Sequence, residues 1–324
     1  MREIFIGIDL GGTNVKIGCF DSNLKLVAKT SIPTQLELGP ESIIDRTVQA
    51  AENLVLKAGL SVDNICAAGI GSPGPVDIDA GIVIATSNLR FTNVPLRQIL
   101  SDRLGKPAVL ENDANVTCWA EHVAGAGKGA DDMVLVTLGT GVGGGIISNG
   151  ELVHGLGCNA GEMGHIIIYP DGRLCGCGQK GCVEAYASAS STAARAAEAI
   201  KAGAQSSLKK LLDEKGEITC KEVFEHVAAG DKLAKEITQD TAKALAILCI
   251  VLLHTTGPER VVFFGGMIGA GDLLLKPIRK FFDQYIWTIN KEKMELCFAT
   301  LGDDAGIIGT ASLAIHAREQ GRLG

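Results

Sequence analysis

Apolar, β-branched runs that end at glycines recur along this chain. Residues 4–8 and 15–20 are such runs, and the turn between them reads D-L-G-G-T-N. Residues 133–138 and 146–148 repeat this arrangement around a glycine-rich turn that reads G-T-G-V-G-G-G. Short runs of this kind, bounded by glycine, are typical of strands joined by tight turns. The sequence therefore predicts two similar strand–turn–strand hairpins, which form a weak internal repeat.

Neither hairpin fits a helix-based phosphate-binding motif. The P-loop string G-x-x-x-x-G-K-[ST] occurs nowhere in the chain. The G-x-G-x-x-G match at residues 139–144 runs into a turn at 148–150, whereas a dinucleotide site requires a helix there. Hairpin tips can still present backbone N–H groups to phosphate oxygens, and Asp9 is placed to hold hydrated Mg²⁺. The alternative is that these glycines only permit tight turns, but the repeat favours a polyphosphate held by both hairpins.

Helical and strand patterns alternate through the rest of the chain, which is typical of an α/β protein. Apolar residues at helical spacing, such as Ile44, Val48, Ala51 and Val55, predict a helix. The predicted helices are 41–58, 95–104, 114–124, 187–202, 206–214, 220–228, 232–255, 272–285 and a last one, capped by Asp303, that reaches residue 318. Further strands are predicted at 65–70, 108–110, 166–168, 260–264 and 295–299.

Two of these strands also end at glycines. The strand at 65–70 enters the rigid turn G-S-P-G-P, and the strand at 260–264 enters Gly265 and Gly266. A glycine pair at a strand end suits close backbone approach to a flat ligand such as adenine. A tight β–α turn is the commoner cause of such a pair.

A carboxylate follows the predicted strand at 108–110, where the chain reads Glu111-Asn112-Asp113. An acid at the carboxyl end of a strand and before a helix points toward the crevice where α/β proteins perform chemistry. Aspartate is also a frequent helix N-cap. From this segment alone, Asp113 is equally a candidate catalytic residue and a candidate cap.

Residues 161–184 concentrate cysteines, glycines and one histidine. Cys175, Cys177 and Cys182 form C-x-C-x4-C with glycines between and around them, and His165 precedes a short apolar run. A strand and turn after His165 are expected to fold the cysteine loop back toward it, and glycine permits the sharp turns that this needs. Three cysteines and a histidine form a closed, structural zinc set. The alternatives are reduced thiols in a turn or a labile disulfide.

Two glutamates flank these predicted zinc ligands. Glu162 precedes His165 by three residues, and Glu184 follows Cys182 by two. Carboxylates held on a rigid frame suit recognition of a polyhydroxylated ligand, because each hydroxyl then meets a fixed partner. The alternative is a pair of solvated surface acids.

Size and composition limit the classes of protein that remain. A chain of 324 residues favours two lobes, and a net charge of −7 disfavours nucleic-acid binding. The start shows no signal-peptide pattern, and the apolar run at 244–253 is too short to span a bilayer. Ten cysteines without such a signal are typical of cytosolic thiols. We therefore expect a cytoplasmic protein without nucleic-acid or membrane partners.

These motifs, taken in order, resemble the ROK family of bacterial sugar kinases and repressors. The strings are D-L-G-G-T-N at 9–14, E-N-D at 111–113, L-G-T-G-V-G-G-G at 138–145, G-E-M-G-H at 161–165 and C-G-C-G-Q-K-G-C-V-E at 175–184. The last string is very specific, and the resemblance covers essentially the whole chain. It is strongest to the ATP-dependent glucokinases of that family, which act in glycolysis. One departure is T-S-N-L at 86–89, where relatives often read T-P-N-L.

The resemblance implies an actin-like/hexokinase fold of two ribonuclease-H-like lobes with a central cleft. It implies phosphorylation of the 6-hydroxyl of glucose by Mg-ATP, with Asp113 as the general base and one structural zinc per chain on His165, Cys175, Cys177 and Cys182. Sugar ligands are then Gly74, Asn112, Asp113, Glu162, His165 and Glu184. ATP ligands are Asp9, Gly11, Gly12, Thr13, Asn14, Lys16, Gly139, Thr140, Gly141, Gly143, Gly265 and Gly266. A homodimer or homotetramer is expected.

Domain limits and rival functions complete these expectations. We expect residues 1–115 with 303–324 to form the smaller lobe, and 116–302 to form the larger lobe with the zinc loop. Mannose, fructose, allose or N-acetylhexosamines such as N-acetylmannosamine remain possible acceptors, and polyphosphate remains a possible donor. A sugar-responsive repressor is the rival from another class. It would need an N-terminal DNA-binding domain, whereas the first predicted strand already starts at Ile4.

Overall fold

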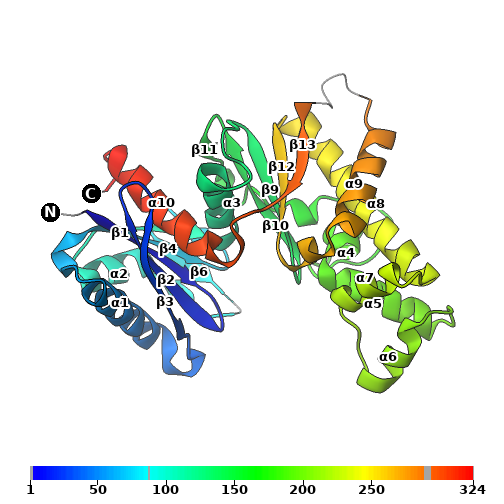
Figure 1. Ribbon diagram of the computed structural model, residues 1–324, viewed down its shortest axis with the longest axis horizontal. Helices are drawn as coiled ribbons and strands as arrows, with labels where there is room; N and C mark the ends of the chain where they lie inside the picture. Colours follow the sequence, from blue (N-terminus) through cyan, green and yellow to red (C-terminus); the bar gives the residue numbers. More distant parts are fainter. Residues whose placement is uncertain (1–2, 87, 288–292, 324) are drawn as a thin grey trace. The chain divides into compact units, whose positions relative to one another are not determined.

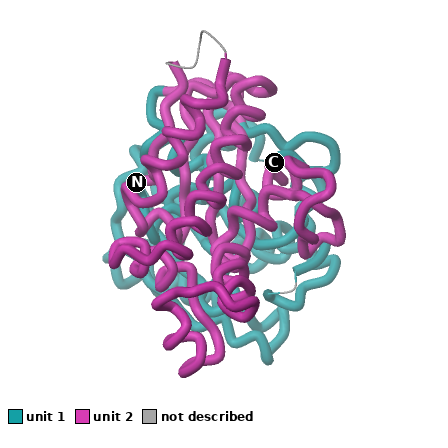
Figure 2. Tube along the Cα trace, turned by 90° about the vertical axis from the view of Figure 1, so that its right-hand side faces the viewer, with its two compact units in different colours: residues 1–129, 152–160, 300–324 teal, residues 130–151, 161–299 magenta. Residues whose placement is uncertain are grey.

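The computed structural model describes residues 3–86, 88–287 and 293–323 (Figure 1). Ser87, which stands where relatives of the predicted family often have proline, lies outside these residues. The chain divides into two compact units (Figure 2). Unit 1 comprises Met1–Gly129, Leu152–Ala160 and Thr300–Gly324, and unit 2 comprises Ala130–Glu151 and Gly161–Ala299.

The main sheet of unit 1 has the strand order β3-β2-β1-β4-β8. Its strands are β1 (Ile4–Leu10), β2 (Asn14–Asp21), β3 (Leu26–Pro33), β4 (Ile65–Ser72) and β8 (Ala108–Asn112). β1 to β3 pair antiparallel, and β4 and β8 continue the sheet in parallel. A smaller sheet joins β5 (Val76–Asp77), β6 (Ile82–Ala85) and β7 (Thr92–Val94).

Helices cover both faces of this main sheet. α1 (Gly39–Lys57) and α2 (Leu96–Leu104) lie on one face, and α3 (Asp113–Ala124) and α10 (Ala305–Glu319) lie on the other (Figure 1). Apolar residues of α1 and α2 are buried against the β-branched residues of β1 and β2. Unit 1 is therefore a three-layer α/β/α structure. Its short 3₁₀ segments are η1 (Leu36–Leu38), η2 (Val62–Asn64), η3 (Leu156–Cys158) and η7 (Gly302–Asp304).

α10 packs on a row of glycines in the middle of the sheet. Gly18, Gly7 and Gly69 are register partners on β2, β1 and β4. A Cβ atom on Gly69 would lie 1.9 Å from the carbonyl oxygen of Thr310, and one on Gly7 would lie 2.0 Å from that of Ile307. Only glycine leaves room for a helix backbone this close to a strand backbone.

Unit 2 repeats the strand order of unit 1 as β11-β10-β9-β12-β13. Its strands are β9 (Met133–Leu138), β10 (Val142–Ser148), β11 (Glu151–Leu152), β12 (Arg260–Phe264) and β13 (Glu295–Phe298). β9 pairs antiparallel with β10 and parallel with β12, as β1 does with β2 and β4. The weak hairpin repeat in the sequence is thus the visible part of two similar sheets.

The helices of unit 2 pack around a large apolar core. They are α4 (Glu184–Ala187), α5 (Ala189–Lys201), α6 (Leu208–Lys215), α7 (Cys220–Ala228), α8 (Lys232–Thr255) and α9 (Asp272–Tyr285), with η4 (Met163–His165) and η5 (Gly266–Ala270). Val136 and Phe263 from the strands meet Leu245 and Leu248 of α8 in this core. Among the described helices, α8 alone has the length and hydropathy of a membrane span, and half of its most apolar stretch is buried inside the protein.

Several predicted elements match the structure from end to end: 133–138, 220–228, 232–255, 260–264 and 272–285. The strand predicted at 166–168 is wrong, because only an isolated bridge joins Ile167 to Cys182. The cap of α10 was also misplaced. Asp304 occupies the N-cap position without a side-chain cap bond, and its carboxylate pairs with Lys29 instead.

The unit boundaries fall elsewhere than expected. α3 packs against α10, so unit 1 continues to Gly129 instead of ending at 115. Leu152–Ala160 also belongs to unit 1, because η3 contacts β5. The final boundary lies between Ala299 and Thr300.

The glycine row yields a test of the packing. Gly69→Ala should lower the free energy of unfolding by about 3 kcal/mol, because an overpacked methyl group forces α10 off the sheet. Ser31→Ala, on the exposed side of β3, is the matched control and should change it by no more than about 0.5 kcal/mol. Urea unfolding followed by circular dichroism measures both variants. An unchanged midpoint for Gly69→Ala would contradict the described packing.

Candidate active site

The junction of β8 and α3 carries the candidate base. The side chain of Asn112 accepts hydrogen bonds from the backbone N–H groups of Ala114 at 2.9 Å and Asn115 at 3.3 Å. Asn112 is therefore the N-cap of α3, and Asp113 is the first residue of the helix. Asp113 Oδ1 accepts a further bond from the N–H of Ala114 at 2.9 Å. The helix has its cap without Asp113, which removes the main structural explanation for that acid.

The surroundings of Asp113 make its carboxyl group a weaker acid. Desolvation is the largest cause and the nearby carboxylate of Asp9 adds to it, so that the pKa of Asp113 is raised to about 6. The side chain nevertheless keeps access to solvent. A carboxylate with a pKa just below neutrality is ionised at pH 7 and is a better proton acceptor than an ordinary aspartate.

Asp9 lies at the end of β1, against the first turn of α10. A Cβ atom on Gly306 would come within 2.5 Å of the Asp9 carboxylate, so glycine is required there. Burial raises the pKa of Asp9, and the charge of Lys16, its register partner on β2, opposes that rise. Lys16 itself donates to the carbonyl oxygen of Asp303 at 3.0 Å. Asp9 thus lies at the positive end of a helix.

The predicted phosphate hairpin of unit 1 is a tight β1–β2 connection. The N–H of Gly11 donates to the carbonyl oxygen of Asn14 at 3.1 Å, and the carbonyl oxygen of Thr13 accepts from the N–H of Thr34 at 2.9 Å. Gly12 lies beside Asn88, with a notional Cβ 3.4 Å from that residue. The hairpin tip is therefore fixed by its own backbone and by the chain that follows β3.

Gly74 is tied to the same junction as Asp113. The side-chain amide of Asn112 donates to the carbonyl oxygen of Gly74 at 3.2 Å. Gly74 has φ +87°, and a Cβ atom there would lie 2.2 Å from the carbonyl oxygen of Ala85. The position accepts glycine alone, because both the backbone conformation and the space forbid a side chain.

Glu111 is a site residue to which the sequence assigned no role. It is 4% exposed, and its Oε1 accepts from the N–H of Asn112 at 2.9 Å and from the side-chain amide of Asn115 at 3.0 Å. Its Oε2 lies 2.8 Å from Nε2 of His154. The Glu111 carboxylate thus joins the end of β8, the first turn of α3 and His154 through hydrogen bonds. Its place in the E-N-D string was the available signal.

The glycine hairpin of unit 2 is held by two side chains. The N–H of Gly143 donates to Oγ1 of Thr137 at 3.0 Å, and the N–H of Val142 donates to Oε2 of Glu184 at 3.0 Å. A Cβ atom on Gly141 would lie 2.5 Å from the same Glu184 oxygen. The structure therefore links the predicted phosphate hairpin to a residue predicted to bind sugar.

His165, Cys175, Cys177 and Cys182 come together although the expected strand between them is absent. Their ligand atoms all lie within 4.8 Å of one another. The N–H groups of Ile168 and Tyr169 donate to the carbonyl oxygen of Gly181, and this folds the loop back. Gly181 has φ +81°, and a Cβ there would meet the carbonyl oxygen of Tyr169.

The chemistry of this Cys₃His group fits a zinc ion. Sγ of Cys175 lies 3.9 Å from Nδ1 of His165, and the sulfurs of Cys177 and Cys182 are 3.7 Å apart without a disulfide. Burial raises the pKa of Cys175 to about 12, so this sulfur needs a cation beside it to be a thiolate at neutral pH. Three thiolates and one imidazole are a donor set that selects zinc.

The two glutamates beside this group differ in their surroundings. Oε1 of Glu184 lies 3.4 Å from Sγ of Cys175, while its Oε2 holds the N–H of Val142. Glu184 is thus fixed by both the cysteine loop and the glycine hairpin. The side chain of Glu162 is 64% exposed, and its carboxylate lies 4.0 Å from Nε2 of His165. It remains free to reorient around a ligand.

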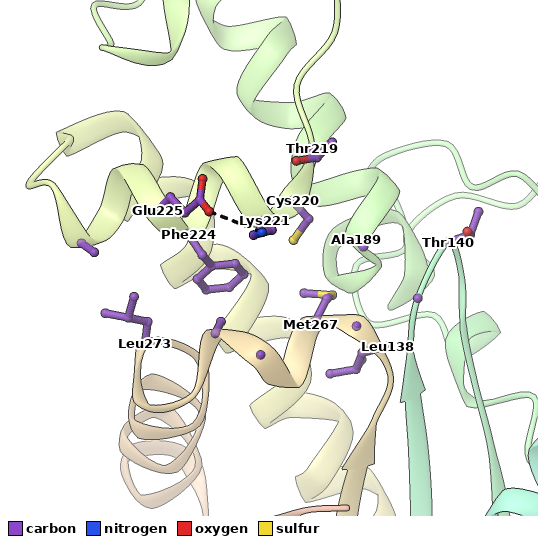
Figure 3. Close-up of a pocket in the computed structure, with 15 residues that line it drawn as sticks. Leu138, Thr140, Ala189, Thr219, Cys220, Lys221, Phe224, Glu225, Met267 and Leu273 are labelled. Atoms are coloured by element: carbon purple, nitrogen blue, oxygen red, sulfur yellow. Dashed lines mark ion pairs between the residues drawn. The ribbon is translucent and has the colours of Figure 1, made fainter. Parts of the chain in front are cut away.

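An apolar pocket of about 670 Å³ opens in unit 2 beside the glycine hairpin (Figure 3). Phe224 and Met267 form its inner wall, and Lys221 pairs with Glu225 on α7 nearby (Figure 3). Gly265 has φ +106°, and a Cβ atom there would lie 2.6 Å from the carbonyl oxygen of Leu138. The two backbones therefore approach each other closely at this point. The lining residues are Leu138, Gly139, Thr140, Ala189, Thr219, Cys220, Lys221, Phe224, Glu225, Ala228, Gly266, Met267, Gly269, Ala270 and Leu273.

This pocket brings together parts of the chain that the sequence left separate. The predicted ATP residues Gly139, Thr140 and Gly266 all line it. Its α7 wall was predicted as a helix without any function, and only the Cys220–Phe224 spacing hinted at an apolar face. Its size and apolar lining suit a flat heteroaromatic group.

Comparison with known proteins places these features in one family. The protein-family model described as "ROK family" matches residues 5–317 of this chain. The chain is 36% identical to the glucokinase of Halalkalibacterium halodurans over 94% of this chain and 93% of that protein. It is 33% identical to the N-acetylmannosamine kinase of Citrobacter koseri over 95% of this chain and 98% of that protein.

A solved structure agrees with this assignment. The ROK family glucokinase from Streptomyces griseus, crystallised with glucose and AMPPNP, matches with a TM-score of 0.76 and 34% identity over 97% of this chain and 99% of that one. The fold is the actin-like ATPase fold, as the resemblance predicted. With a family match over nearly its full length and relatives well above 30% identity, this chain belongs to the ROK family.

Proposed function

We propose that this protein phosphorylates the 6-hydroxyl of glucose with Mg-ATP, using Asp113 as the general base. Full-length similarity to glucokinases makes the chain an ATP-dependent sugar kinase. The observation that carries the proposed base is the β8–α3 junction, where Asn112, and not Asp113, is the N-cap of the helix. The pKa of Asp113, raised to about 6, suits proton transfer near neutral pH.

The proposed reaction follows from the chemistry of phosphoryl transfer. The sugar oxygen forms a bond to the γ-phosphorus while the bond from that phosphorus to the bridging oxygen of ADP breaks. The hydroxyl proton passes to the carboxylate of Asp113. Because such transition states are loose, the protein contributes mainly position and charge neutralisation.

The donor is proposed to bind through backbone groups and an apolar pocket. The pocket in unit 2 would take the adenine, and Gly265 and Gly266 allow the chain to approach it. N–H groups of the hairpins at 11–14 and 139–143 would contact phosphate oxygens. Lys16 would add positive charge, and Asp9 would hold the Mg²⁺ that accompanies ATP through its water shell.

Two of the proposed sugar ligands are already fixed by hydrogen bonds. Asn112 is held by Gly74 and by the helix that it caps, and Glu184 is held by Val142. Glu162 and His165 complete the proposed sugar ligands. Fixed hydrogen-bonding partners reduce the entropy lost when the sugar is oriented for attack.

A structural zinc on His165, Cys175, Cys177 and Cys182 is part of the proposal. Four protein ligands leave no position for a reactive water, so the metal would supply rigidity. Its binding would fix the ring of His165 and the loop that precedes Glu184. A cytoplasmic location and a homodimer or homotetramer are proposed on the family resemblance alone.

N-acetylmannosamine is the second candidate acceptor, because relatives that phosphorylate it are almost as similar as the glucokinases. A coupled assay of ADP release over glucose, mannose, fructose, allose and N-acetylmannosamine separates the candidates. We expect the highest kcat/KM for glucose and a product identified by ³¹P NMR as the 6-phosphate. A higher kcat/KM for N-acetylmannosamine, or efficient transfer from polyphosphate in place of ATP, would overturn the proposal.

Asp113→Asn should lower kcat by about two to four orders of magnitude and leave sugar affinity within a few-fold. The amide keeps the shape of the side chain but cannot take the proton. Steady-state kinetics and calorimetric glucose binding measure the two effects. A variant that keeps most of its kcat would return Asp113 to a merely structural role.

The pKa of Asp113 also predicts a pH profile. The base must be ionised, and its pKa is raised to about 6, so kcat/KM for glucose should rise between pH 5 and 7. Below about pH 6 it should fall about tenfold per pH unit. Initial rates between pH 5 and 8 at saturating Mg-ATP give the profile. A rate that stays constant down to pH 5 contradicts the assignment.

Removal of one predicted zinc ligand tests the metal. Cys177→Ala should abolish bound zinc, lower the melting temperature and raise the glucose KM about tenfold or more. Cys66→Ala, a free cysteine in unit 1, is the matched control and should keep all three values. Mass spectrometry of the purified wild type should find one zinc per chain. Fully active, metal-free wild-type protein would exclude the proposed role.

A further inference from the structure

Glu111 is a buried acid whose charge needs compensation. It is 4% exposed, and a carboxylate so far removed from water is costly unless it is paired and fully hydrogen-bonded. Among the ion pairs of the described residues, Glu111 pairs with His154 at 2.8 Å, and no lysine or arginine pair is found for it there. The other Glu111 oxygen accepts two neutral N–H donors.

Those two neutral donors belong to the predicted catalytic segment. One is the backbone N–H of Asn112, and the other is the side-chain amide of Asn115, in the first turn of α3. Glu111 therefore fixes both sides of the bend between β8 and α3. Asp113 lies at that bend, between the two residues that Glu111 holds.

His154 reaches this bend from a distant stretch of the chain. It lies in the segment Leu152–Ala160, which belongs to unit 1 although unit 2 precedes and follows it in the chain. The carbonyl oxygen of His154 accepts from the N–H of Ala160 at 3.0 Å. Gly155 and Gly157, both at positive φ, bend this segment. Its imidazole is about one-third exposed, at a cavity of about 300 Å³.

We propose that His154 is a positioning residue for phosphoryl transfer: its imidazole holds Glu111, and Glu111 holds the backbone that aims Asn112 and Asp113. This inference rests on the proposed role of Asp113. His154 does not touch the reacting atoms in this scheme. His154 affects the rate through the alignment of Asp113 with the sugar hydroxyl. A displacement of a catalytic group by about 1 Å can lower the rate about 100-fold.

The charges around His154 favour its protonated form. The hydrogen bond to Glu111 is the largest cause that raises the pKa of His154, and the charges of Glu111 and Asp79 add to it, against the effect of burial. Asp77 and Cys158 line the same cavity, and the guanidinium of Arg97 donates to the carbonyl oxygens of Ile78 and Asp79. Because the folded-state pKa is raised, His154 keeps its positive charge to a higher pH than in the unfolded chain and loses it as pH rises through that pKa.

The test is a double-mutant cycle on the full-length enzyme with His154→Gln, Glu111→Gln and the double variant. Each single variant should lower kcat/KM for glucose about 10- to 100-fold and leave the KM for ATP within about twofold. The double variant should lose no more than the worse single variant, because both changes break one chain of contacts. His226→Gln, an α7 histidine bonded to Ser207, is the control and should keep wild-type kinetics.

Two results would overturn this inference while wild-type activity toward glucose is intact. One is a His154→Gln enzyme with wild-type kcat/KM. The other is a loss that is additive in the double variant and that affects glucose and ATP parameters equally, as general loosening of unit 1 would. If His154→Gln does not fold, the near-isosteric Glu111→Gln carries the same test. A wild-type enzyme inactive toward every sugar contradicts the proposed function instead.

Discussion

The buried carboxylate of Glu111 is the constraint on which the proposed chemistry depends. A strand that ends beside a helix start leaves unpaired N–H groups at the bend, and these need acceptors. Here Glu111 takes the N–H of Asn112, and Asn112 takes those of Ala114 and Asn115. The N–H groups of Asn112, Ala114 and Asn115 thus all have acceptors at the bend that carries Asp113.

In unit 2, too, a buried framework and one carboxylate hold the residues of the proposed site. Both units build a five-stranded sheet with one strand order, and both place a glycine-rich hairpin on the central antiparallel pair. In unit 2 the hairpin is fastened by Glu184, which the cysteine loop also contacts. One carboxylate therefore couples the geometry of a proposed phosphate contact to that of a proposed sugar contact.

Features with a local cause were predictable from the sequence. The Cys₃His group followed from spacing and glycines, and the two similar hairpins followed from the repeated strand–glycine–strand pattern, whereas the two-lobed fold came from chain length and the family resemblance. The strand predicted after His165 was wrong because Ile166 and Ile168 pack against the unit 2 core from a folded-back loop, in which only an isolated bridge joins Ile167 to Cys182. From the E-N-D segment alone, the sequence did not show which of Asn112 and Asp113 caps the helix, because both residue types cap helices well. The hydrogen bonds identify Asn112 as the cap.

Features with a distant cause could not be predicted. His154 meets Glu111 across 43 positions of the chain, and nothing in the residues next to His154 announces that pairing. The wall of the apolar pocket likewise combines α7 with η5 and the β9 end, which only tertiary packing brings together. The unit boundary was misplaced for the same reason, since the packing of α3 on α10 joins residues far apart in sequence.

The central claim is that Asp113 is held as a base of raised pKa by its surroundings. The most direct test is a ¹³C NMR titration of aspartate carboxyl groups, with the Asp113 resonance identified by its loss in Asp113→Asn. The account predicts that this resonance titrates with a midpoint near pH 6. A midpoint near 4, the ordinary value for aspartate, would contradict it.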